Sequence, residues 1–87
     1  VYSSVYIMNR NFTREQLVDI VNRVFSDKEC GDVFRIKGFF SVEQDSWLEL
    51  NATVHKTEIK PIDKGQEIII IIGSDLMEDK IKQYFEE

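Results

Sequence analysis

The sequence lacks the features of several protein classes. It has a single cysteine, so no disulfide can form within the chain. Its longest apolar run, Ile68 to Ile72, is far shorter than the roughly 18 residues that a membrane-spanning helix needs. Basic residues are outnumbered, 11 against 16 acidic ones, which gives a net charge of −5. That balance argues against nucleic acid or an anionic membrane as a partner.

The composition that remains is that of a soluble globular chain, with 43% apolar and 31% charged residues in 87. This length predicts one domain, stabilised by its core alone. The chain starts at Val1 and opens directly into an apolar segment with no charged leader. We therefore expect a piece of a longer polypeptide, separated at a domain boundary.

The first helix is predicted over residues 13 to 27. Thr13 and Gln16 fit a capping box, and Phe12 can pack against Leu17 across the helix start. Spacings of three and four residues then place an apolar stripe on one side, which should face a sheet. The stripe consists of Leu17, Ile20, Val21, Val24 and Phe25.

Two strands are predicted to follow as an antiparallel hairpin, over residues 33–42 and 47–54, with residues 43–46 as a polar turn. The first strand alternates, with Phe34, Ile36, Phe40 and Val42 on one face and Arg35, Lys37 and Ser41 on the other. Residues 55–62 either continue extended or turn once more. Pro61 fits best at an edge or a strand end, because it has no ladder donor.

Ile68 to Ile72 predict the most buried strand, since β-branched residues occupy both of its faces. A closing helix is expected after Asp75, which would cap it with Glu78 three positions on. The apolar stripe of that helix is Met77, Ile81, Tyr84 and Phe85. The predicted fold class is α+β: a two-layer sandwich in β-α-β-β-β-α order, with a mostly antiparallel sheet and two helices on one face.

Such a sheet leaves its second face uncovered, and an aromatic, apolar face is a candidate contact surface. The residues that can lie there are Tyr2, Tyr6, Val33, Phe39 and Trp47. The alternative is that they fill the core or sit singly on the surface. Arg35 and Lys37 can form a small basic patch for an acidic partner or a phosphate, or can be solvated strand residues. The candidate contact surface is therefore Arg35, Lys37, Phe39 and Trp47.

No catalytic, cofactor-binding or metal-binding site is predicted in the chain. His55 is the only imidazole, near Glu49 and Glu58 in sequence, and a solvated position is the simpler reading of it than a weak auxiliary metal site. Cys30 has no evident basic partner to make it a nucleophile. We expect no enzymatic activity from these residues.

Three segments together resemble the C-terminal domain of the CobW family. They are Val33 to Gly38, Trp47 to Asn51 and Gln66 to Gly73. In that family a strand with Arg-x-Lys-Gly follows the first helix, as Arg35 to Gly38 do here, and a hydrophobic strand ending in Ile-Gly precedes the last helix, as Ile72 and Gly73 do. The likeness spans nearly the whole chain.

The resemblance implies a cytoplasmic accessory domain of a P-loop GTPase, one of the metal chaperones named for a role associated with cobalamin synthesis. The family binds GTP, and a divalent metal such as zinc or cobalt, in its N-terminal domain, and neither its phosphate loop nor its Cys-x-Cys-Cys segment occurs in this chain. The implied partners are the N-terminal GTPase domain of the same polypeptide and a client metalloprotein. The domain would act by protein contact or regulation, with no catalytic site of its own.

A second hypothesis belongs to another class. The chain can be a free-standing module that binds a protein or a small ligand, and that self-associates through an edge strand or the aromatic sheet face. It predicts a stable dimer or a saturable ligand, whereas the first hypothesis predicts a weak ligand response in isolation.

Overall fold

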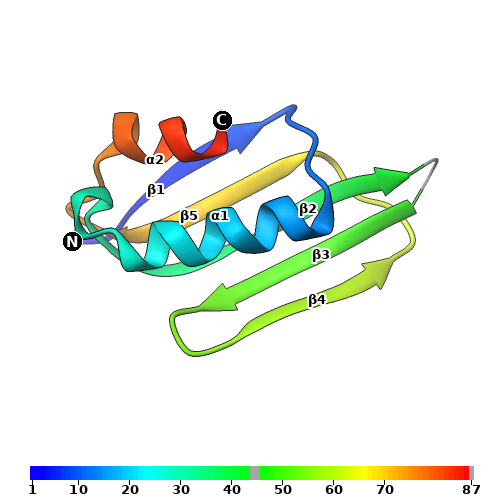
Figure 1. Cartoon of the computed structure of the whole chain (residues 1–87), viewed down its shortest axis with the longest axis horizontal. Helices are drawn as coiled ribbons and strands as arrows, with labels where there is room; N and C mark the ends of the chain where they lie inside the picture. Colours follow the sequence, from blue (N-terminus) through cyan, green and yellow to red (C-terminus); the bar gives the residue numbers. More distant parts are fainter. Residues whose placement is uncertain (44–45, 87) are drawn as a thin grey trace.

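The computed structural model describes residues 1–43 and 46–86, and this part of the chain forms five strands and two α-helices (Figure 1). In chain order they are β1 (Ser3–Met8), α1 (Arg14–Ser26), a short 3-10 helix (Lys28–Cys30), β2 (Asp32–Glu43), β3 (Ser46–Thr53), β4 (Thr57–Ile62), β5 (Ile68–Ser74) and α2 (Glu78–Phe85). Of the predicted turn at 43–46, Glu43 and Ser46 belong to strands, and residues 44 and 45 lie outside the described residues.

The strands form one sheet in the order β1-β5-β2-β3-β4, and every neighbouring pair is antiparallel. Both helices lie on the same face of this sheet (Figure 1). The predicted two-layer α+β class is therefore confirmed. The structure adds β4 to the expected order, in the segment that the sequence left open, and Pro61 lies in this edge strand, where no ladder donor is missed.

Helix α1 begins as its sequence predicts. The Gln16 N–H donates to Thr13 Oγ1 at 3.0 Å, and the Thr13 N–H donates to Gln16 Oε1 at 2.9 Å, which completes the capping box. Leu17, Val21 and Val24 are fully buried against the sheet. The amphipathic pattern thus sets which side of α1 faces the sheet.

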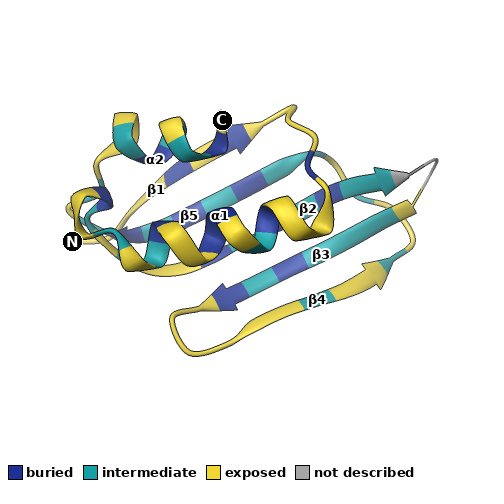
Figure 2. Ribbon diagram, viewed as in Figure 1, coloured by how far each residue is buried: buried dark blue, intermediate teal, exposed yellow. Residues whose placement is uncertain are grey.

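The core lies between the helices and the sheet, and the burial pattern in Figure 2 alternates along the strands. In β5, Ile69 and Ile71 are buried, while Ile68, Ile70 and Ile72 are only half-buried. Every other strand has exposed residues and β5 has none, so the expectation that it is the most buried strand of the sheet is confirmed. Both helices cover the first face, and no described element covers the other.

Two local details differ from the sequence prediction. A register shift between Val33 and Arg35 takes Phe34 out of the buried row, and its side chain is 38% exposed beside Tyr2, with 5.1 Å between the ring centres. Asp75 does not cap α2, because it lies outside the helix with φ 54°, and Met77 is the N-cap residue, without a side-chain hydrogen bond.

Close packing between two strands explains the glycine at position 38. A Cβ at Gly38 would collide with the backbone carbonyl oxygen of Ile68 on β5. The close approach of β2 to β5 therefore requires glycine here. No helix within the described residues is long and apolar enough to cross a membrane.

Candidate functional site

The face of the sheet that carries no helix combines apolar, aromatic and charged side chains. Strand register assigns its members, because cross-strand partners share a face. Lys37 pairs with Ile70 on one side and with Asn51 on the other, so these three lie on the same face. We call this surface the open face. Its members are Ser4, Tyr6, Met8, Arg35, Lys37, Phe39, Ser41, Trp47, Glu49, Asn51, Thr53, Glu58, Lys60, Ile62, Ile68, Ile70 and Ile72.

The four residues predicted as a contact surface, Arg35, Lys37, Phe39 and Trp47, all lie on the open face. Tyr6 lies there too, since it pairs with Ile70. Val33 does not: it pairs with Gly73 and packs against the core on the helix side. For Val33 the alternative, a place against the core, therefore holds, because the register shift that follows it changes the alternation.

An aromatic corner occupies one end of the open face. Trp47 pairs across the strands with Ile62, and Phe39 lies on the neighbouring strand β2. The loop between β4 and β5 packs onto these side chains at Gly65, where an added Cβ would lie 3.0 Å from Phe39 Cβ and 3.2 Å from Trp47 Cε3. This contact explains why both aromatic residues are half-buried although no helix covers them. The sequence alone did not indicate that Gly65 packs against Phe39 and Trp47.

Arg35 and Lys37 carry the positive charge at the centre of the open face. Arg35 Nε donates to Asn51 Oδ1 at 3.0 Å. The two acidic residues of the open face pair with lysines, Glu49 with Lys60 at 3.7 Å and Glu58 with Lys56 at 3.4 Å. Among residues 1–43 and 46–86, no ion pair joins a carboxylate to Arg35 or Lys37.

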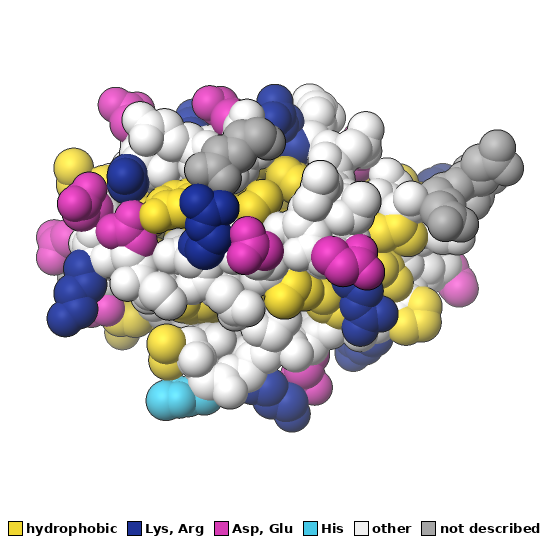
Figure 3. Space-filling model, in the orientation of Figure 1, with side chains coloured by type: hydrophobic (Ala, Val, Ile, Leu, Met, Phe, Trp, Pro, Cys, Tyr) yellow, Lys and Arg dark blue, Asp and Glu magenta, His cyan; other side chains and the backbone are white. Residues whose placement is uncertain are grey.

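The helix-bearing side has a different surface. Figure 3 shows it with acidic and basic side chains interspersed, and with apolar atoms visible only in small patches between them. Several of the charges pair with each other, such as Lys82 with Glu78 at 2.7 Å. Interspersed and paired charges of this kind are typical of a solvated face.

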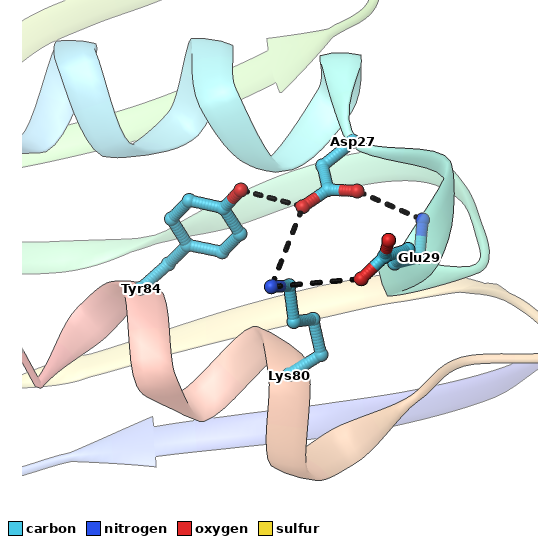
Figure 4. A network of polar contacts seen from close by, with 4 residues as sticks. All are labelled: Asp27, Glu29, Lys80 and Tyr84. Atoms are coloured by element: carbon cyan, nitrogen blue, oxygen red, sulfur yellow. Dashed lines mark hydrogen bonds and ion pairs between the residues drawn. The ribbon is translucent and has the colours of Figure 1, made fainter.

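A polar network fastens α2 to the end of α1 (Figure 4). The Tyr84 hydroxyl donates to Asp27 Oδ2 at 2.5 Å, and the Glu29 N–H donates to Asp27 Oδ1 at 2.9 Å. Lys80 Nζ lies 4.0 Å from Asp27 Oδ2 and 3.6 Å from Glu29 Oε1. Each of these polar groups has a partner, and together the contacts join the end of α1, the 3-10 helix and α2.

The same contacts shift two pKa values in opposite directions. The Tyr84 hydroxyl, and then the Glu29 N–H, lower the pKa of Asp27, because both stabilise its carboxylate. The bond to Asp27 raises the pKa of Tyr84 to about 12, because the phenol must stay protonated to donate. Asp27 thus stays charged and Tyr84 neutral at physiological pH, and their hydrogen bond holds α2 against the end of α1.

Cys30 is buried, whereas His55 is exposed. Burial raises the pKa of the Cys30 thiol, which disfavours the nucleophilic thiolate. His55 is exposed in the turn between β3 and β4, with its backbone N–H bonded to Thr53 Oγ1. No three His, Cys, Asp or Glu side chains cluster as metal ligands in the part of the chain that the structure describes.

Comparison with known proteins assigns the family of this chain. The family model for the cobalamin synthesis protein CobW C-terminal domain matches residues 1–87. The chain belongs to the CobW C-terminal domain family. The resemblance of the Arg35 to Gly38 and Gln66 to Gly73 segments is thereby confirmed.

Two solved structures share the fold of this CobW C-terminal domain. One is Zn(II)-bound YjiA GTPase from E. coli, with a TM-score of 0.74, and the other is a Zn(II)-bound triple mutant of YjiA GTPase, with a TM-score of 0.75. Each is 15% identical, and the match covers 98% of this chain but 29% of theirs. The chain thus spans under a third of the length of these proteins. No match was found among the curated proteins.

Proposed function

We propose that this domain is the accessory, protein-contact domain of a CobW-like GTP-dependent metal chaperone, cytoplasmic and related to cobalamin synthesis. In this proposal the remainder of the polypeptide binds GTP and a divalent metal such as zinc or cobalt. The domain reads or transmits the nucleotide state of that part and contacts a client metalloprotein. It performs no bond-making step.

One observation carries the proposal: a domain of this family presents a sheet face that its own helices leave uncovered, with aromatic, aliphatic and cationic side chains side by side. An uncovered apolar face of this kind is characteristic of a protein-contact surface. The kinship with proteins described as Zn(II)-bound GTPases, which are more than three times as long, supports a parent with a separate GTPase part.

The test compares the full-length parent protein with the same protein truncated just before Val1. We expect GTP hydrolysis and metal binding to persist in the truncated protein, and nucleotide-dependent capture of a client to be lost. If client capture is unchanged by truncation, the contact role is refuted. If the 87-residue domain itself hydrolyses GTP, its assignment as a domain without a catalytic site is refuted.

A further inference from the structure

We infer that the open face is covered, in the parent protein, by the GTPase part of the same polypeptide, and that carboxylates of that part pair with Arg35 and Lys37. This inference rests on the proposed function, since it presupposes a parent with a GTPase part. It goes further by naming the surface, the occupant and the charge that the occupant carries.

The extent of apolar side chains on the open face is the first argument. Tyr6 and Met8 are each 54% exposed. On β5, Ile68 lies between Met8 and Phe39, and Ile70 lies beside Tyr6, so apolar side chains continue from β1 through β5 to the aromatic corner. A lone soluble domain rarely leaves so continuous a patch in water.

Charge supplies the second argument. Arg35 and Lys37 project from the centre of this face with isoleucines beside them on β5, Ile72 and Ile70 respectively. Covering the face with an uncharged apolar surface would strip water from two cations without compensation, which is unfavourable. The carboxylates of Glu49 and Glu58 already have partners. The covering surface must therefore bring its own carboxylates.

This charge selects against a second copy of the domain. In a two-fold dimer through the open face, the central cations of one copy would approach those of the other. Like charges in a buried interface are costly, so the symmetric pairing is disfavoured.

The remaining chain of the parent is the favoured occupant. More than two thirds of each matched structure lies outside the shared fold. Tethering to such a part also raises its effective concentration at the open face, which lets an interface of modest intrinsic affinity stay closed.

The test uses hydroxyl-radical oxidation of the full-length parent, read by mass spectrometry at two methionines. Met8 lies on the open face and Met77 lies at the start of α2 on the helix-bearing side, and they are 54% and 56% exposed in this domain. Their equal exposure makes Met77 an internal control. We expect Met8 to oxidise several-fold more slowly than Met77, at a ratio independent of protein concentration.

Charge reversal then tests the role of the cations. R35E and K37E together should raise Met8 oxidation to the rate of Met77, while R14E, an equivalent change on the exposed start of α1, should leave Met8 protected. Circular dichroism checks that each variant remains folded, and the wild-type Met8 to Met77 ratio tests the coverage even if the double variant does not fold.

Each other outcome overturns a part of the inference. Equal oxidation of Met8 and Met77 in the wild-type parent refutes coverage of the open face. Protection that grows with protein concentration assigns the face to a second copy, and protection that appears only with a client assigns it to the client. Continued protection in the charge-reversed parent refutes the carboxylate pairing. These results are independent of the truncation test, since a truncated parent can lose client capture even if the open face proves uncovered.

Discussion

At the scale of single residues, Asp27 shows how one side chain can join three elements. It follows α1, accepts from the backbone at the start of the 3-10 helix, and accepts from Tyr84 on α2. Arg23 adds a second contact from α1, with its guanidinium carbon 5.0 Å from the centre of the Tyr84 ring. The position of α2 thus depends on contacts that leave no periodic trace in the sequence.

Replacing Tyr84 by phenylalanine should lower the urea midpoint of unfolding in a pH-dependent way. The lowered pKa of Asp27 contributes stability above its ordinary value of 3.8, and this contribution is lost as the pH falls through its folded-state pKa. The raised pKa of Tyr84 contributes stability that is complete below 10.0 and lost as the pH rises towards about 12. The difference between wild type and Y84F should therefore be largest between these limits and shrink at both extremes.

The control for that titration is Y6F, which removes the hydroxyl of an exposed tyrosine. Within residues 1–43 and 46–86 this hydroxyl makes no hydrogen bond. Its midpoint should follow wild type at every pH. A pH-independent loss in Y84F would show that the hydroxyl acts only by packing.

Two glycine substitutions compare the cost of crowding backbone atoms with the cost of crowding side-chain atoms. G38A places a Cβ against the backbone of β5, which cannot yield, so the loss should lie at or above the top of the range of roughly 1–3 kcal/mol for overpacking. G65A meets only side chains of the aromatic corner, at 3.0–3.2 Å, and should lie near the bottom of that range, at about 1 kcal/mol. Urea unfolding, followed by the fluorescence of the single tryptophan, Trp47, measures both. Equal losses would contradict the rigid contact assigned to Gly38.

At the scale of elements, the sequence predicted those whose signals are local. Helix α1 carries its own cap and stripe, and β2, β3 and β5 carry alternating or β-branched runs. The sequence did not decide whether β4 is a strand, because Pro61 and the polar residues around it are also typical of a loop. Only the pairing with β3 identifies this segment as a strand. The start of α2 was misplaced, since Asp75 has cap chemistry but lies in a left-handed conformation before the helix.

The clearest prediction at this scale concerns the start of α1. T13A removes the oxygen that accepts the Gln16 N–H, and it should cost about 1 kcal/mol of the free energy of unfolding. T13S keeps that oxygen and should stay close to wild type. Chemical denaturation of the three proteins measures the difference. If T13A matched wild type, the capping box would contribute nothing to stability.

At the scale of the whole molecule, the candidate site was predicted as a set of residues but not as a surface. Alternation alone placed Arg35 and Lys37 together, and the register of β2 with β3 brings Phe39 and Trp47 to the same face. The outward isoleucines of β5 were not assigned to this surface, because a run of five isoleucines gives no sign of which face carries no helix. Their part in the open face depends on strand order, a long-range property that no local pattern encodes.

The balance between the open face and the net charge predicts how the 87-residue domain associates. At pH 7 the charge of −5 and the central cations of the open face both oppose pairing, so sedimentation should show a monomer. Near the isoelectric point of about 4.8 the net repulsion vanishes, and the apolar face should drive association. I70K adds a third cation to the centre of that face and should suppress association at pH 4.8, whereas V18K, on a partly exposed position of α1, should not. A dimer already present at pH 7 would contradict the charge argument, and it would favour a self-associating module over the contact domain of a larger GTPase.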